Sequence, residues 1–457
     1  MQALPPWLSR GSAVVVSALA VTVVAAGVGA ADTDDGYWYF DNYDVASFHE
    51  QGIDGSGVKI AVIDTVIDPD APFLADANIT VHEPSFCVPD EEGGEPVPAT
   101  ITGGAASVHA HGTNVTGFLV GNGDRGPKGI APRAEITFYS WGDNLGDEDD
   151  LNCTARGSEG MGYRADAAGA LEAALADDPD IVTLSVTGSF AERSQLRDPI
   201  ARAMREGVII TSAAPNDDSE LGGDATSANG VVGVGSVGAD GQVPTSEVLD
   251  GEELVTVHNT NEWLDVVAPG VGLTVGGGAS WEAPEPRNGT SYATPITAGN
   301  VALALQANPE ATPNQVLQLL IHNTGVDAPH EPVFDPTGEV GYGVVDTISL
   351  LGDDATKYED VNPFILDGDD QSPTVEEIFG ETAATGDPEP SVEASREAFP
   401  SPAAPTAEPT TEPAPTDSGN TMTVVWIAVG VVVVVAVVVP VVVVGARRRS
   451  GRQGVVR

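Results

Sequence analysis

One short segment, residues 289–295, constrains the fold of this chain more than any other part of it. The segment reads Gly-Thr-Ser-Tyr-Ala-Thr-Pro, and small, mostly apolar residues continue after it without a charge. This pattern indicates a buried helix that begins close to Ser291. The start of a helix presents backbone N–H groups and the positive end of the helix dipole, where a developing oxyanion is stabilised. The segment therefore predicts a nucleophilic serine, provided that a base and a carboxylate lie upstream.

An aspartate and a histidine lie upstream in suitable settings. Residues 59–65 form a β-branched run that contains Asp64 near its end. Such a run is typical of a buried parallel strand with its polar residue at the carboxyl edge of a sheet. His111 precedes Gly112 at an expected helix start. Serine needs a base to take its proton, and the imidazole needs a carboxylate to hold its tautomer, so the three residues predict a catalytic triad.

With these motifs, in the order Asp, His, Ser, the chain resembles the subtilisin-like serine proteases, the subtilases. The resemblance covers residues 45–351 and implies an α/β fold, a three-layer domain whose mostly parallel central sheet is flanked by helices. It implies a serine endopeptidase with Asp64, His111 and Ser291 as catalytic residues and Asn216 as oxyanion donor. It implies no cofactor and no catalytic metal. The substrate-binding residues that it implies are Ser185, Val186, Thr187, Ala213, Ala214 and Pro215.

Four positions depart from the usual family pattern. Val66, Thr187 and Pro215 stand where the family commonly has glycine, and Thr116 stands where alanine is usual. We expect a different local backbone at Val66 and a narrower substrate pocket beside Thr187 and Pro215. No catalytic side chain is lost. A non-catalytic scaffold that binds peptide on the same fold remains the alternative.

The amino-terminal end predicts export. Residues 1–30 read as a signal peptide, because an apolar run is followed by small residues and then by acidic ones. An uncleaved amino-terminal anchor is the alternative. Residues 31–44 are expected to form an arm whose aromatic cluster, residues 37–40, packs on the protease domain.

The carboxyl-terminal end predicts a membrane anchor. Residues 422–446 are expected to form a transmembrane helix, because residues 423–446 are uncharged and dominated by valine. The basic residues 447–457 follow as a cytoplasmic tail, which leaves everything before the helix outside the cytoplasm. We therefore expect a single-pass protein of the cell membrane. A buried strand of a soluble protein is the alternative.

The linker between protease and membrane spans residues 352–421. It is acidic first and then rich in proline, threonine and alanine, so we expect an unfolded, extended stalk. Its main apolar island, residues 364–366, is expected to pack back on the protease domain.

The order of these segments resembles the mycosins, membrane-anchored subtilases that accompany type VII secretion in actinobacteria. Too few residues separate the signal from Asp64 for a folded propeptide. The expected partners are a protein or peptide substrate, the cell membrane and a secretion complex. A general surface subtilase is the alternative.

The net charge of the chain limits the kinds of partner that it can bind. The net charge is −49, from 19 basic and 68 acidic residues. Residues 1–30 hold one arginine, residues 447–457 hold five, and neither end holds an acidic residue, so the part between them carries −55. Such a charge argues against nucleic acid as a partner.

The two cysteines and one acidic segment allow further predictions. Cys87 and Cys153 both lie in the exported part, which favours a disulfide, with two buried free thiols as the alternative. Residues 143–150 are dense in oxygen ligands and invite a structural calcium ion, although they lack the EF-hand spacing. A solvated acidic loop is the alternative.

Overall fold

The computed structural model describes residues 36–89, 97–101, 111–141, 163–186, 193–216, 225–250, 253–258, 263–325, 327–335, 337–368 and 371–380. The predicted signal peptide, transmembrane helix and basic tail lie outside these residues, as does the linker from residue 381 onward. Within the described ranges, no helix is both long enough and apolar enough to cross a membrane.

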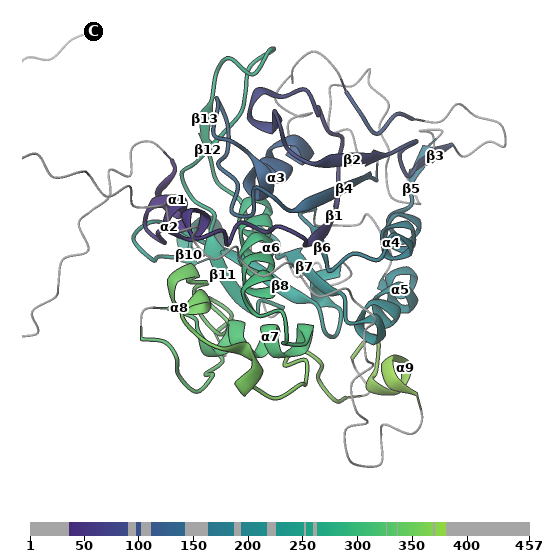
Figure 1. Ribbon diagram of the computed structural model, residues 1–457, viewed down its shortest axis with the longest axis vertical. Helices are drawn as coiled ribbons and strands as arrows, with labels where there is room; N and C mark the ends of the chain where they lie inside the picture. The colour runs from purple at the N-terminus through teal and green to yellow at the C-terminus, as the bar shows by residue number, and fades with distance from the viewer. Residues whose placement is uncertain are drawn as a thin grey trace, which may run out of the picture. The chain divides into compact units, whose positions relative to one another are not determined.

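A seven-stranded sheet forms the centre of the domain (Figure 1). All its neighbouring strands run parallel. Strand β1 lies inside the sheet and is covered on both faces, which explains why its sequence is apolar almost without interruption. In spatial order the strands are β11 (Val266–Pro269), β8 (Val232–Val237), β7 (Ile209–Ala213), β6 (Ile181–Leu184), β1 (Lys59–Asp64), β4 (Glu135–Ser140) and β2 (Ile79–His82).

Helices cover both faces of this sheet. Alternate residues of β1 enter two different cores: Ile60 and Val62 contribute to one, and Ala61 and Ile63 to the other. The first core contains α3 (His111–Val120), α6 (Thr290–Ala307), α7 (Pro313–His322) and α8 (Thr347–Leu351), and the second contains α4 (Ala167–Ala176) and α5 (Arg193–Glu206). The predicted three-layer α/β fold with a mostly parallel sheet is therefore confirmed.

Helix α6 crosses the first core. Most of its side chains are buried, and they are small, so the helix can approach its neighbours closely. A Cβ atom at Gly299 would lie 2.7 Å from the Cβ atom of Ile130, so only glycine fits at this contact. The long buried helix places Ser291 in a rigid position near its first turn.

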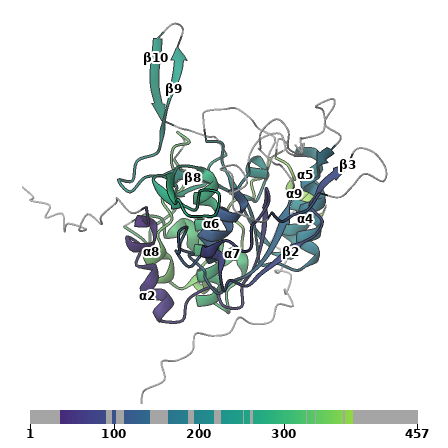
Figure 2. The same ribbon diagram turned by 90° about the horizontal axis from the view of Figure 1, so that it is seen from above.

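Within the described ranges, three short antiparallel pairs lie outside the main sheet. One of them, the hairpin of β9 and β10, extends away from the rest of the domain in Figure 2. The pairs are β3 (Cys87–Pro89) with β5 (Tyr163–Ala165), β9 (Thr245–Asp250) with β10 (Glu253–His258), and β12 (Leu273–Val275) with β13 (Glu285–Arg287). The short 3-10 helices are η2 (Pro72–Leu74), η3 (Ala225–Ser227) and η4 (Ala355–Lys357).

The amino-terminal arm packs on the domain through its aromatic residues. It contains α1 (Trp38–Asp41) and leads into α2 (Val45–Glu50). The indole N–H of Trp38 donates to the carbonyl of Val271 at 3.0 Å, and the hydroxyl of Tyr39 donates to the carbonyl of Lys128 at 2.7 Å. Both aromatic side chains are buried. The predicted packing is confirmed for the described part of the arm, residues 36–44.

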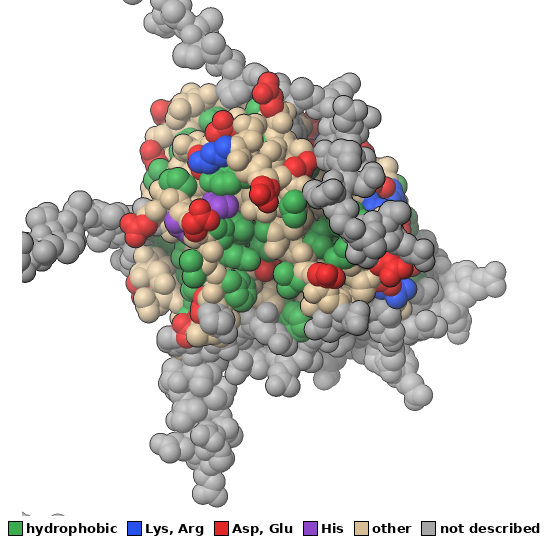
Figure 3. Space-filling model, turned by 90° about the horizontal axis from the view of Figure 1, so that it is seen from below, with side chains coloured by type: hydrophobic (Ala, Val, Ile, Leu, Met, Phe, Trp, Pro, Cys, Tyr) green, Lys and Arg blue, Asp and Glu red, His purple; other side chains and the backbone are tan. Residues whose placement is uncertain are grey.

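One face of the domain exposes apolar side chains. Figure 3 shows hydrophobic side chains gathered among scattered carboxylates on this face. The large exposed hydrophobic side chains of the described residues come from the last part of the domain: Val333, Phe334, Ile348, Val361, Leu366 and Phe379. The ring of Phe334 lies 5.2 Å from that of Tyr342, which in turn lies 6.1 Å from the ring of Phe364.

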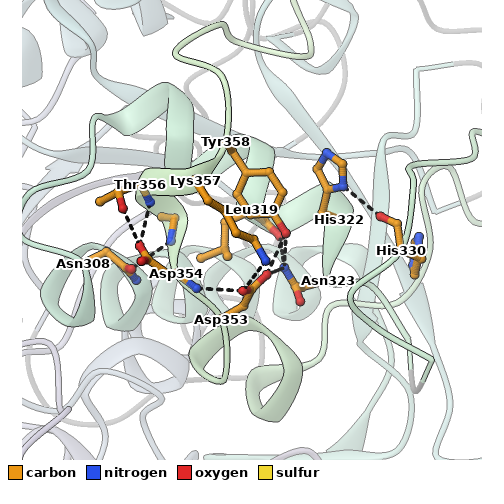
Figure 4. Close-up of polar contacts among 11 residues, drawn as sticks. Asn308, Leu319, His322, Asn323, His330, Asp353, Asp354, Thr356, Lys357 and Tyr358 are labelled. Atoms are coloured by element: carbon orange, nitrogen blue, oxygen red, sulfur yellow. Dashed lines mark hydrogen bonds and ion pairs between the residues drawn. The ribbon is translucent and has the colours of Figure 1, made fainter.

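The domain continues past the boundary that the sequence predicted at residue 351. Asp353 accepts hydrogen bonds from Lys357 Nζ at 2.5 Å, from the hydroxyl of Tyr358 at 2.7 Å and from Asn323 Nδ2 at 3.1 Å (Figure 4). Burial acts to raise the pKa of Asp353, but these bonds outweigh it and lower the pKa to about 2. Because Asn323 follows α7, this network ties the start of the predicted linker to the domain.

The following residues also pack. Phe364 is 5% exposed, and Ile378 in α9 (Val375–Phe379) is fully buried. The side chain of Asn229 donates to the carbonyl of Leu366 and accepts from its N–H, and Arg205 Nη1 donates to the carbonyl of Ile378. The prediction that residues 364–366 pack back on the domain is confirmed. The prediction of an unfolded stalk is wrong for residues 352–380, because these few apolar side chains find partners in α5 and in the loop before β8.

Candidate active site

Asp64 lies at the carboxyl end of β1, between β4 and β6. Its side chain is fully buried. Oδ1 accepts a hydrogen bond from the backbone N–H of Thr65 at 2.7 Å and from the Thr65 hydroxyl at 3.2 Å. Burial in the sheet and these two local bonds hold the carboxylate in one orientation.

His111 begins α3, opposite the carboxylate. Its Nδ1 lies 2.7 Å from Oδ1 of Asp64, and its side chain is 22% exposed. A carboxylate oxygen can only accept, so Nδ1 carries the proton and Nε2 is the nitrogen that can act as a base. Burial acts to lower the pKa of His111, but the charge of Asp64 and the hydrogen bond to it outweigh burial and raise the pKa above 6.5.

Gly112 makes this close approach possible. A Cβ atom on Gly112 would lie 2.7 Å from the carbonyl oxygen of Val66 and 2.8 Å from Cζ of Phe138. It would also lie 3.2 Å from Oδ1 of Asp64. Any larger residue would push the start of α3 away from β1. The Gly after the histidine thus sets the distance between base and carboxylate.

Ser291 is the second residue of α6 and is half-buried. The residue before the helix, Gly289, has extended backbone, and its N–H donates to the carbonyl of Gly270 at 2.8 Å. The first N–H groups of a helix have no partner within the helix, so they are directed to whatever lies beyond its start. Ser291 therefore lies where the sequence predicts it, in the first turn of a buried helix.

Asn216 follows β7 and is tied to the residue before Ser291. Its Oδ1 accepts from the backbone N–H of Thr290 at 2.9 Å and from the Thr290 hydroxyl at 3.2 Å. The same hydroxyl donates to the carbonyl of Ala214 at 2.6 Å. With the oxygen of the carboxamide engaged in this way, its nitrogen is the atom that can donate to an oxyanion.

A cavity of about 320 Å³ brings these residues together. Of the residues that the sequence predicts, His111, Ser185, Val186, Asn216 and Ser291 line it, and Asp64 lies behind His111. Thr65, Trp141, Asn288, Gly289 and Tyr292 line it as well and were not predicted as site residues. The cavity therefore joins a predicted base, a predicted nucleophile and a predicted amide donor.

Three of the predicted substrate-binding residues do not line this cavity. Ala213 is the last residue of β7, and Ala214 and Pro215 follow it; all three are buried, and the chain reaches the surface at Asn216. Thr187 lies outside the described residues. The side chain of Pro215 therefore does not narrow this cavity in the way that the sequence predicted.

The other departures from the family pattern are accommodated locally. Val66 is buried and does not adopt the left-handed conformation that would favour glycine. Thr116 is buried within α3, where its hydroxyl donates to the carbonyl of Gly112 at 2.8 Å. Neither residue displaces His111 from Asp64.

The sequence gives little indication that two aromatic residues, Trp141 and Tyr292, line the cavity. Trp141 directly follows β4, the strand that pairs with β1, and Tyr292 directly follows Ser291. The Tyr292 ring lies 6.1 Å from the His111 ring and 5.3 Å from the Phe118 ring. Burial raises the pKa of Tyr292 to about 12, so its hydroxyl stays neutral at physiological pH. The sequence shows that both aromatic residues are close to predicted structural elements of the site. It does not show that their side chains line the cavity, because that depends on the fold.

The predicted disulfide is tested only in part, and the predicted calcium site is not tested. Cys87 is buried, and its sulfur is in a disulfide. Its predicted partner, Cys153, and the acidic residues 143–150 lie outside the described residues. Among the residues that are described, no group of three or more His, Cys, Asp or Glu side chains is arranged to hold a metal ion.

The comparisons with known proteins agree with this geometry. Residues 55–373 match the model of the subtilase family. The match covers well over half of the chain, and the chain therefore belongs to the subtilase family.

Individual relatives are distant. Subtilisin E of Bacillus subtilis (strain 168) is 29% identical over 277 residues, which cover 59% of this chain and 61% of that protein. Subtilisin of Bacillus pumilus is 28% identical over 277 residues, which cover 59% of this chain and 84% of that protein. The chain thus spans less than two thirds of the length of subtilisin E. The crystal structure of MycP1 from the ESX-1 type VII secretion system is 18% identical, with a TM-score of 0.49, and covers 74% of this chain and 90% of that chain.

Proposed function

We propose that this chain is a serine endopeptidase that hydrolyses peptide bonds in proteins or peptides outside the cytoplasm. The observation that carries the proposal is the hydrogen bond between Asp64 and His111 beside a cavity that also contains Ser291 and Asn216. Each group has the chemistry that its role requires, and family membership supports the same reaction.

The proposed reaction begins with proton transfer. Nε2 of His111 takes the hydroxyl proton of Ser291 as the serine oxygen attacks the peptide carbonyl. Asp64 holds the imidazole by Nδ1 and stabilises the imidazolium that forms. The amide nitrogen of Asn216 and the backbone N–H of Ser291 donate to the oxyanion.

The second half releases the products. His111 gives its proton to the leaving amine, the carbon–nitrogen bond breaks, and an ester of Ser291 remains. Water then attacks this ester with His111 again as base, which frees the carboxylic acid and returns the proton to Ser291. No step needs a cofactor.

A fluorophosphonate probe tests the proposal directly, because it reacts with an activated serine. The full-length protein should be labelled at Ser291, and Ser291→Ala should abolish both labelling and peptidase activity. Ser280→Ala is the matched control, since Ser280 is exposed on the loop between β12 and β13 and should change neither. A folded protein that binds peptide but takes up no label would instead be the scaffold that the sequence left as the alternative.

We also propose that the enzyme is anchored in the cell membrane by residues 422–446 and serves a type VII secretion complex, as mycosins do. The order of the sequence segments supports this proposal. A predicted signal peptide is followed by the protease domain, a proline-rich linker, an apolar segment and a basic tail. Copurification of the tagged protein with membrane components of such a system would support the second part. Normal secretion through that system in cells without the protein would contradict it.

A further inference from the structure

Three buried oxygen atoms lie at the carboxyl end of β1 without a hydrogen-bond partner in the described part of the chain. They are Oδ2 of Asp64, Oγ of Ser140 and Oγ of Ser185. Each belongs to a residue that is at most 1% exposed. Buried polar groups in folded proteins nearly always have a partner, so three such atoms on adjacent strands require an explanation.

The strand register places the three residues side by side. Asp64 pairs directly with Ser140 of the parallel strand β4. On the other side of β1, Ile63 pairs with Leu184 of β6, and Ser185 is the next residue. Side chains alternate along a strand, and paired residues of neighbouring strands point to the same face of the sheet. The side chains of both serines therefore flank that of Asp64 on one face.

Core packing supports the shared face. Val62 and Phe138, two residues before Asp64 and Ser140, enter the same core. A Cβ atom on Gly112 would contact both Phe138 and the Asp64 carboxylate, so that face is the one that α3 covers. Ser140 and His111 therefore approach the same carboxylate from β4 and α3.

The unmatched groups are chemically complementary. Oδ1 of Asp64 already accepts from His111 and Thr65, whereas Oδ2 accepts from nothing in the described residues. A carboxylate oxygen is an acceptor, and a serine hydroxyl carries one donor proton. Rotation about the Cα–Cβ bond of serine moves the hydroxyl between three staggered positions without any change in the backbone.

We propose that Ser140 is a positioning residue for the catalytic reaction, whose hydroxyl donates to Oδ2 of Asp64 in the working enzyme. The bond holds the carboxylate in the plane in which Oδ1 meets His111, and it stabilises the ionised form of the carboxylate. Ser140 touches no substrate, since it is fully buried and does not line the cavity. Ser185 lines the cavity, so the inference is confined to Ser140. This inference rests on the proposed peptidase activity.

The other ionisable groups near Asp64 are few. Within the described residues, His111 on α3 and Tyr292 on α6 interact with its charge, and Arg287 and Glu285 of β13 act on Tyr292. Burial raises the pKa of Tyr292 to about 12, so His111 is the ionisable neighbour of Asp64 whose protonation the acid limb of the pH profile reports. On the flanking strand ends, the neighbours of Asp64 are the two serines, which do not titrate.

The test is the pH profile of kcat/KM for Ser140→Ala in the full-length protein. The hydroxyl draws negative charge from the Asp64 carboxylate, so its loss should strengthen the attraction of that carboxylate for the imidazolium and raise the pKa of His111 further. We expect the midpoint of the acid limb to rise by about 0.5–1 pH unit. Below the midpoint, kcat/KM of the variant should be about 3- to 10-fold lower than that of the wild type. On the plateau the two values should be nearly equal. Ser140→Thr, which keeps the hydroxyl, should restore the wild-type profile.

Thr211→Val is the matched control. Thr211 is also fully buried with a hydroxyl that lacks a partner in the described residues, but it lies on β7, two strands from β1. Its profile should coincide with that of the wild type. If Ser140→Ala does not fold, Ser140→Cys replaces it, because a thiol of similar size is a weak donor and should shift the limb in the same direction.

Coincident acid limbs for the wild type and for a folded Ser140→Ala or Ser140→Cys variant would overturn the assignment of Ser140. An equal shift in Thr211→Val would overturn it too, since the effect would then be general. Neither result touches the peptidase activity itself, whose failure would appear as an inactive, unlabelled wild-type protein.

Discussion

Catalysis and stability place opposite demands on His111. The pKa of His111 is raised because Asp64 outweighs burial. A raised pKa means that the charged imidazole stabilises the fold below the unfolded pKa, near 6.5, and that this contribution is lost as the pH rises through the folded value. A general base, by contrast, must be neutral.

The resulting prediction concerns the pH dependence of the wild-type enzyme. The acid limb of kcat/KM should have its midpoint above 6.5, the ordinary pKa of histidine. Initial rates on a peptide substrate between about pH 5 and pH 9 measure it. A midpoint clearly below 6.5 would show that burial, and not Asp64, controls the imidazole.

Asn216 supports a second prediction at the scale of a single residue. Asn216→Ala should lower kcat by about 10²–10³, the loss measured when the corresponding donor was removed from a subtilisin. KM should change little, whereas thermal stability should fall slightly, because Oδ1 of Asn216 also accepts two hydrogen bonds from the buried Thr290. Asn122→Ala, at another asparagine exposed outside the cavity, is the control. An unchanged kcat in Asn216→Ala would remove the residue from the oxyanion site.

Asp265 predicts a pH-dependent stability away from the site. It precedes β11, and its Oδ2 accepts from the N–H of Gly233 at 2.8 Å. Burial raises its pKa to about 7, although this hydrogen bond acts against the rise. Between the unfolded value of 3.8 and about 7 the folded state holds one more proton than the unfolded state, so this residue lowers stability as the pH rises through that range.

Asp265→Asn should remove that contribution. The melting temperature of the wild type should fall more steeply between about pH 5 and pH 7.5 than that of the variant, by about 2–6 °C over the range. Thermal unfolding in buffers of equal ionic strength measures the two slopes. Parallel slopes would mean that Asp265 titrates as an ordinary exposed carboxyl group.

At the scale of elements, the end of the domain is the part for which amino-acid composition led to a wrong prediction, namely an unfolded stalk from residue 352 onward. Residues 352–380 carry many charges, yet Phe364 and Ile378 are buried against the domain, and Asp353 is held by three side-chain donors. A short polar segment can pack when a few apolar residues meet a preformed surface, since the domain supplies most of the buried area.

A pair of truncated proteins tests this boundary. A chain that ends at residue 380 should unfold at the same temperature as the full-length protein. A chain that ends at residue 351 should lose about 3–6 kcal/mol, the burial of a phenylalanine and an isoleucine, and should unfold at a temperature lower by roughly 10 °C or more. Equal melting temperatures for the two truncated chains would show that the stable domain ends at residue 351, as the sequence predicted.

At the scale of the whole molecule, strong negative charge and the proposed anchor act together. The chain carries a net charge of −49, and the six arginines near its two ends are separated from the acidic middle. We expect the full-length protein to stay with membranes after a high-salt wash, which removes proteins held by charge alone, and to dissolve in detergent. Fractionation with antibody detection measures this.

Proteolysis extends the same prediction. A cut between residues 388 and 421 should release a soluble domain that keeps its peptidase activity, because the described domain ends before that stretch. Recovery of the full-length chain from the medium would contradict the anchor. Release by salt alone would show that the chain is attached through another protein.

The catalytic side chains could be predicted from local sequence because each lies in a short motif with its own physical signature. Asp64 ends a buried β-branched run, and Ser291 begins a helix of small residues. Such patterns depend on neighbours a few residues away, so they survive without knowledge of the rest of the fold. The sequence by itself therefore determined the family and the motifs that carry Asp64, His111 and Ser291, whereas the signal peptide and the membrane helix stay predictions.

Contacts between distant residues were decided only by the tertiary structure. Thr290 orients the amide of Asn216 across 74 positions of sequence, and Asn229 holds Leu366 across 137. The register of β1 with β4 likewise set Ser140 beside Asp64. Burial and hydrogen bonding depend on which surfaces are in contact in the folded protein, and a short sequence pattern does not contain that information. For that reason the cavity wall and the true end of the domain became visible only in the folded molecule.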